Sequence, residues 1–80
     1  MIRRVTVLKE NAMNEEALNT SLRQFLKMVG ITSQREIEMN IREAIADGRL
    51  NASETLSVKV VLTVEKVGLT HNIDGTIKLQ

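Results

Sequence analysis

A helical period governs the hydrophobic positions of residues 14–29. The apolar side chains lie at positions i, i+4, i+7, i+8 and i+11: Leu18, Leu22, Phe25, Leu26 and Val29. That spacing places them on one face of an α-helix. Asn14 is a residue type that caps helix starts, and Gly30 is the type that closes helix ends. The pattern predicts a helix over residues 14–29.

The next segment predicts a second helix, over residues 33–47. Ser33 and Glu36 have the spacing of a capping box, in which each side chain bonds a free backbone N–H at a helix start. The apolar residues that follow again share one helical face: Ile37, Ile41, Ala44 and Ile45. Gly48 is the expected end, with Leu50 as its hydrophobic contact. Because the linker between the two patterns is short, we expect two antiparallel helices that are neighbours in space.

The period changes to two in the C-terminal part of the chain. Alternate residues are apolar over 56–64, and again over 69–79. This alternation predicts two strands with one wet face, and Gly68 marks a turn between them. The two runs therefore predict a long antiparallel β-hairpin.

Gly75 interrupts the apolar alternation of the second strand. A glycine inside a strand indicates a bulge or a close approach by another element. Asp74-Gly75 is also a tight-turn signal. A turn there leaves too few residues for a further strand, so we favour the bulge.

These elements predict an α+β fold, with two antiparallel helices packed on one face of an antiparallel β-hairpin. A two-stranded hairpin is marginal by itself in water. Either residues 4–9 add an N-terminal third strand, or hairpins from two chains pair edge to edge. We expect residues 13–80 to form a single domain and residues 1–12 to be an N-terminal extension, either a strand or disordered.

Composition excludes several classes of protein. The chain has no cysteine and one histidine, His71, which argues against disulfides and against Cys- or His-rich metal sites. Phe25 is the only aromatic residue, so the chain cannot build a stacking platform for single-stranded nucleic acid. No apolar run is long enough to predict a membrane span or a signal peptide. We expect a cytoplasmic protein.

Residues 29–45, "VGITSQREIEMNIREAI", resemble the turn and second helix of a helix-turn-helix. In that interpretation Gln34, Arg35 and Arg42 contact nucleic acid and the hairpin acts as a wing. The predicted helix over 33–47 carries two arginines against four acidic residues, a net charge of −2. Negative charge opposes contact with phosphates. We therefore favour a plain helical hairpin over a helix-turn-helix for this segment, and nucleic-acid binding is kept as the alternative function.

The sequence assigns no catalytic, cofactor-binding or metal-binding residue. It contains none of the phosphate-binding, zinc-protease or nucleophile-elbow motifs. His71 falls on the apolar parity of the second strand, where a general base or a pH switch is conceivable. No motif places a nucleophile near it, so a structural histidine is favoured. We expect a protein that is not an enzyme and needs no cofactor.

Three stretches carry a family resemblance: "MNEEALN" from Met13, "FLKMVGITSQREIE", and the strand pair "LSVKVVLTVE" and "HNIDGTIKL". In them the chain resembles a family of short bacterial proteins of unknown function, whose members begin near Met13. The resemblance covers residues 13–79. It implies a compact bacterial protein and no particular activity, cofactor or site residue.

The functional hypothesis follows from the small size and the unpaired strand edges. We expect a non-enzymatic interaction or regulatory module that works as a homodimer, with another protein as a further possible partner.

Overall fold

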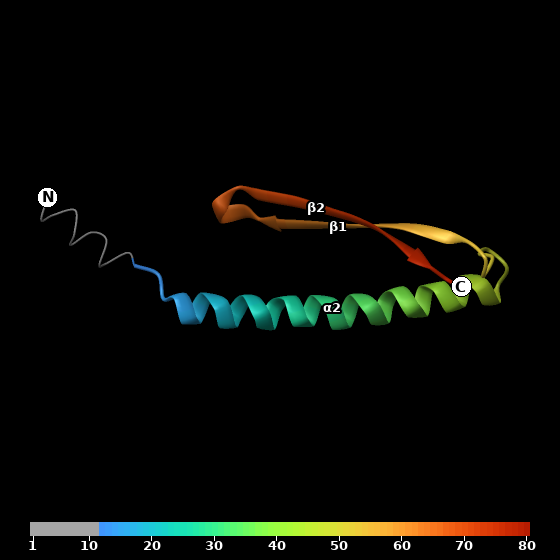
Figure 1. Ribbon diagram of the computed structural model, residues 1–80, viewed down its shortest axis with the longest axis horizontal. Helices are drawn as coiled ribbons and strands as arrows, with labels where there is room; N and C mark the ends of the chain where they lie inside the picture. The colour runs from blue at the N-terminus through green and yellow to red at the C-terminus, as the bar shows by residue number, and fades with distance from the viewer. Residues whose placement is uncertain (1–11) are drawn as a thin grey trace, which may run out of the picture. The chain divides into compact units, whose positions relative to one another are not determined.

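The computed structural model describes residues 12–80, and its first element is one long helix. This helix, α2, spans Glu15–Ala46 without interruption (Figure 1). Its 32 residues correspond to a length of about 48 Å. The predicted pair of antiparallel helices is therefore wrong, because both predicted segments belong to a single helix. The candidate third strand at residues 4–9 lies outside the described residues.

Both ends of α2 are where the sequence predicts them. The N–H of Ala17 donates to Oδ1 of Asn14 at 3.1 Å, so Asn14 caps the helix start. At the other end Gly48 has a φ of 82°, and the N–H of Arg49 donates to the carbonyl oxygen of Ala44 at 2.9 Å. A left-handed glycine followed by this bond is a Schellman motif. The predicted cap and stop residues are confirmed.

The middle of α2 runs through the predicted break. The hydroxyl of Thr32 donates to the carbonyl oxygen of Met28 at 2.8 Å, a bond made within a helix. Ser33 lies in the helix interior, where there is no free helix start for a capping box. A glycine inside a helix costs only about 1 kcal/mol relative to alanine. Without a proline in the chain, nothing forces the helix to end at Gly30.

Replacing Gly30 with alanine should stabilise the protein. Gly30 has no positive φ, and a Cβ added there meets nothing within 4 Å. The substitution removes backbone freedom from the unfolded chain, and we expect a gain of about 0.5–1 kcal/mol. Thermal unfolding followed by circular dichroism at one protein concentration measures this gain as a higher Tm. A lower Tm would indicate a left-handed Gly30 between two helices.

Gly68→Ala is the matched control for this prediction. A Cβ at Gly68 also meets nothing within 4 Å, but its φ is +67°. An alanine there is held in the left-handed region, which costs about 1–2 kcal/mol. The two substitutions should therefore shift Tm in opposite directions.

The second part of the fold is the predicted hairpin. Strand β1 spans Thr55–Val64 and strand β2 spans Leu69–Lys78, joined by the 3₁₀ turn η1 over Glu65–Val67. The strands pair antiparallel from Thr55 opposite Lys78 to Val64 opposite Leu69 (Figure 1). Gly68 closes the turn, as predicted. The sequence is therefore right about the hairpin and its turn.

The bulge predicted at Gly75 is absent. Gly75 pairs with Val58, and the pairs on either side, Ser57 with Thr76 and Lys59 with Asp74, keep the same register. The ladder is regular, so neither a bulge nor a turn accounts for this glycine.

Short-range hydrogen bonds hold the connection between α2 and β1. The N–H of Asn51 donates to Oε2 of Glu54 at 2.9 Å, and the N–H of Ser53 donates to Oδ1 of Asn51 at 3.2 Å. The described residues divide into two units, with the boundary inside α2 between residues 38 and 39.

Candidate interaction surface

One face of the hairpin is almost entirely hydrophobic. We call it the apolar hairpin face, and it consists of five cross-strand pairs: Leu56–Ile77, Val58–Gly75, Val60–Ile73, Leu62–His71 and Val64–Leu69. Side chains on alternate residues of a strand point to the same side, so these pairs form one continuous surface. The predicted one-sided hairpin is confirmed in its pairing.

The opposite face of the hairpin is polar. Its pairs are Thr55–Lys78, Ser57–Thr76, Lys59–Asp74, Val61–Asn72 and Thr63–Thr70. Val61 is the single aliphatic residue among them. Lys59 and Asp74 carry opposite charges directly across the two strands, a pairing worth roughly 0.2–1 kcal/mol. A polar face of this kind is suited to water.

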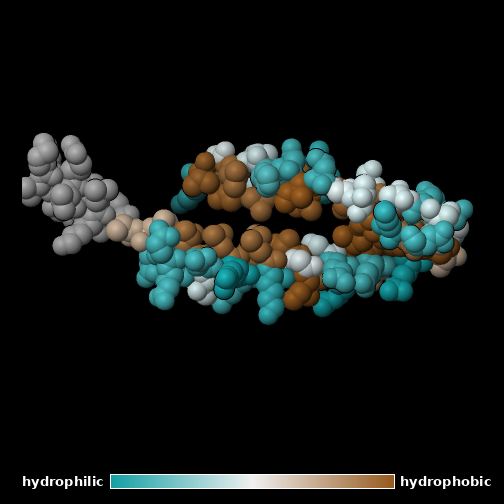
Figure 2. Space-filling view, viewed as in Figure 1, coloured by the Kyte–Doolittle hydropathy of each residue, from teal (hydrophilic) through white to brown (hydrophobic). Residues whose placement is uncertain are grey.

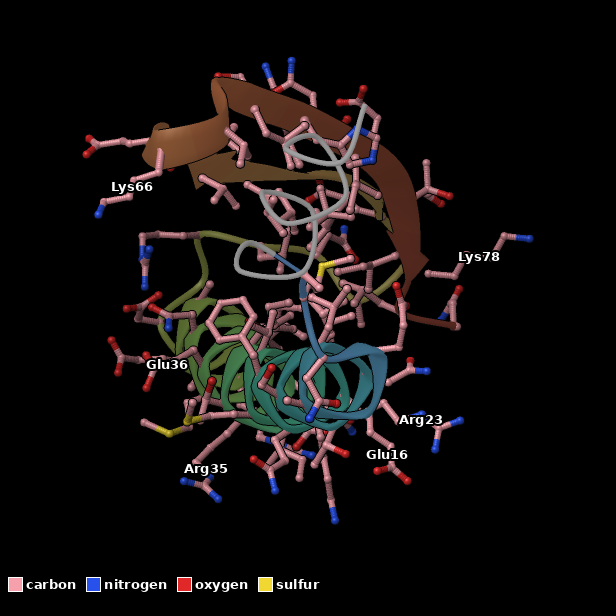
Figure 3. The ribbon with its side chains drawn as sticks, turned by 90° about the vertical axis from the view of Figure 1, so that its left-hand side faces the viewer. Glu16, Arg23, Arg35, Glu36, Lys66 and Lys78 are labelled. Carbon is pink, nitrogen blue, oxygen red and sulfur yellow. The ribbon has the colours of Figure 1, made fainter. Side chains whose placement is uncertain are left out.

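Helix α2 has a hydrophobic side of its own. We call the residues of its N-terminal half that share this side the helix stripe: Leu18, Leu22, Phe25, Leu26 and Val29. Figure 2 shows hydrophobic residues along one side of α2 and hydrophilic residues along the other. Figure 3 shows the charged side chains of Glu16, Arg23 and Arg35 extending outward from the helix. The helix is therefore amphipathic.

Neither hydrophobic surface is buried. No residue of the described chain is buried, and the side chains of Phe25 and Ile73 remain 49% and 50% exposed. The half-buried aliphatic residues are Val29, Ile37, Ile41, Ala44, Leu50, Leu56, Val58, Leu62, Ile77 and Leu79. Most of the helix stripe is exposed, and so is the half of the hairpin nearest the η1 turn, with Leu62 as the exception.

The predicted nucleic-acid contacts all lie on the surface of α2. Gln34, Arg35 and Arg42 are exposed, and Nε2 of Gln34 donates to Oε2 of Glu38 at 3.1 Å. Arg35 and Arg42 are seven residues apart and share a helical side. The turn that the helix-turn-helix interpretation requires does not occur, because residues 29–45 lie within one helix. Contact between these three residues and nucleic acid stays a prediction.

His71 lies on the apolar hairpin face. It is exposed and stands opposite Leu62, with Leu69 and Ile73 as its neighbours on the same side of β2. In the part of the chain that the structure describes, no three His, Cys, Asp or Glu side chains gather as a metal site would require. Lys66 and Lys78, labelled in Figure 3, belong to the two ends of the hairpin and are not part of the apolar hairpin face. His71 is therefore the one ionisable residue of that face.

No helix among residues 12–80 has the length and hydrophobicity that crossing a membrane requires.

Comparison with known proteins gives a family without an assigned activity. A profile described as a family of unknown function, DUF6494, matches residues 13–80. The chain belongs to this family. No curated protein and no solved structure matches it. Membership of DUF6494 therefore confirms the resemblance to a family of unknown function.

Proposed function

We propose that this member of the family is a non-enzymatic interaction module that acts as a homodimer. The observation that carries the proposal is the exposure of its hydrophobic surfaces. The apolar hairpin face and the helix stripe are each continuous, and no described residue is buried. Contiguous exposed hydrophobic surface on a small protein typically marks an interaction site.

The energetics favour covering these surfaces. A domain of this size normally buries about 60% of the surface of its unfolded chain. Complete burial of one large aliphatic side chain is worth about 1.5–3 kcal/mol, and the residues of both surfaces obtain only part of it. A two-stranded hairpin without a third strand or a packed layer is also marginal. A partner that covers these surfaces supplies the missing stabilisation.

A second copy of the chain is the partner that fits these surfaces best. The helix stripe has no ionisable side chain, and the apolar hairpin face has one, that of His71. Neither surface therefore selects a charged partner. Residues 13–80 contain eight basic and nine acidic residues, so two copies repel one another little. In a two-fold dimer each copy offers the same hydrophobic surfaces to the other. Homodimers are the commonest assemblies of soluble proteins.

The strand edges support the same partner. In the described residues each strand pairs only with the other, which leaves one edge of β1 and one edge of β2 unpaired. Neither ten-residue edge contains a proline or a bulge, two of the features that block edge pairing. The non-enzymatic part of the proposal rests on the sequence, which contains no catalytic motif.

The mass of the protein in solution tests the proposal. Light scattering behind size exclusion should give the mass of two chains from low to high micromolar concentration. The reason is that separating the chains exposes both hydrophobic surfaces to water. The mass of one chain at high micromolar concentration would contradict the homodimer.

A further inference from the structure

Gly75 is the one gap in the side chains of the apolar hairpin face. It stands opposite Val58, with Ile73 and Ile77 two residues away on the same side of β2. Because glycine has no Cβ, the row of aliphatic side chains is interrupted at this position, and we call this gap the notch. A glycine inside a strand also weakens it, since it adds backbone freedom and contributes no packing.

The hairpin itself does not require a glycine at this position. The φ of Gly75 is not positive, unlike those of Gly48 and Gly68. The strand pairing is regular on both sides of Gly75. A Cβ built there meets one atom, Cγ1 of Val58 at 3.5 Å, which is ordinary van der Waals contact. Alanine would therefore fit, and by strand propensity it would fit better.

We propose that the notch at Gly75 receives an aliphatic or aromatic side chain from the helix stripe of a second copy. The inference rests on the proposed homodimer and names its contact surface. Close approach by another element is the remaining common reason for a glycine inside a regular strand. With this contact, the apolar hairpin face lies at the centre of the dimer interface.

The chemistry of the notch selects this occupant. Its neighbours on the apolar hairpin face are Val58 across the strands and Ile73 and Ile77 along β2, all aliphatic, so a polar or charged group covered there would lose its hydrogen bonds to water. The helix stripe carries no charge and has the side chains that fill such a notch: Leu18, Leu22, Phe25 and Leu26. Interdigitation of this kind gives interfaces the packing density of protein interiors.

Gly75→Ala tests the proposal by the direction of its effect. If the notch is filled in the dimer, the added methyl displaces the occupant at both symmetric contacts. Overpacking of this kind weakens a packed contact, so the dimer dissociation constant should rise about tenfold or more. Sedimentation equilibrium over a range of concentrations measures it. An unchanged or lower dissociation constant would overturn the proposal.

Ser57→Thr is the matched control. It also adds one methyl group and raises strand propensity, but Ser57 lies on the polar face and pairs with Thr76. We expect its dissociation constant to stay within about twofold of the wild-type value, since surface substitutions change stability little. A loss of stability in Gly75→Ala that does not depend on protein concentration would assign the contact to the same chain and overturn the proposal.

A direct measurement on the wild-type protein covers the case in which a variant does not fold. In a mixture of ¹³C-labelled and unlabelled copies, isotope-filtered NMR detects contacts between chains only. The proposal expects signals from the methyl groups of Ile73 and Ile77 to protons of the other chain. A dimer without such signals would overturn the notch contact and leave the homodimer intact, whereas a monomeric wild-type protein would remove both.

Discussion

Replacing Leu22 with lysine should dissociate the homodimer. Leu22 lies in the middle of the helix stripe and is 48% exposed in the single chain. In the dimer, the substitution removes a buried leucine and introduces a charge at two symmetric positions. Loss of leucine burial alone is worth about 1.5–3 kcal/mol per copy, so we expect the dissociation constant to rise by at least about 100-fold. Sedimentation equilibrium at several concentrations measures the change.

Ile31→Lys is the control for this prediction, because Ile31 is 49% exposed in the same helix. It follows Leu22 by nine residues, which is about two and a half helical turns, so it lies on the opposite side. The single chain exposes both residues equally, and a monomer would respond to the two substitutions alike. We expect less than about a fivefold change in the dissociation constant for Ile31→Lys. Equal effects of the two substitutions would rule out the helix stripe as the contact.

A lysine at Ile73 should disrupt the dimer from the hairpin side. Ile73 pairs with Val60 at the centre of the apolar hairpin face, and its side chain is 50% exposed. A lysine there must either leave its charge in a hydrophobic contact or keep the two surfaces apart. We again expect the dissociation constant to rise by about 100-fold or more, because the substitution removes the burial energy of one isoleucine in each copy. Urea unfolding at several protein concentrations measures the change in dissociation constant, since dissociation and unfolding are coupled in such dimers.

Val61→Lys is the corresponding control on the hairpin. Val61 is 56% exposed and pairs with Asn72 on the polar face. Ile73→Lys and Val61→Lys both replace a β-branched residue of a strand with lysine, so both lower strand propensity. Val61→Lys measures that effect without a change on the apolar hairpin face. If Val61→Lys weakened the dimer as much as Ile73→Lys, the polar face would have to be part of the contact.

Local signals in the sequence account for the parts of the fold that were predicted well. Asn14 and Gly48 mark the ends of α2 because each bonds or bends the backbone at its own position. The hairpin follows from alternation over two runs and a turn between them, so its two faces can be read from parity alone. The apolar hairpin face and the helix stripe, the two candidate surfaces, were both visible as patterns.

The predicted break in α2 failed because its signals are permissive. Gly30 and Ser33 favour a helix end and a helix start, but both residues are also tolerated inside a helix at small cost. A signal for the continuous helix was present. Phe25, Val29, Ser33, Ile37 and Ile41 follow one another at steps of four, which is the spacing of neighbours on a helix surface, so this spacing continues through the predicted linker.

By itself, the sequence determined the outer ends of the helix, the hairpin with its two faces, and the absence of cysteine. These properties depend on single residues or on neighbours a few positions apart. The tertiary structure decided that the chain from Glu15 to Ala46 is one helix and that no described residue becomes buried. Helix continuation is cooperative, because each added residue gains a hydrogen bond without a new nucleation step. Burial depends on which surfaces meet, and a pattern along the chain shows that a surface is hydrophobic without showing what covers it.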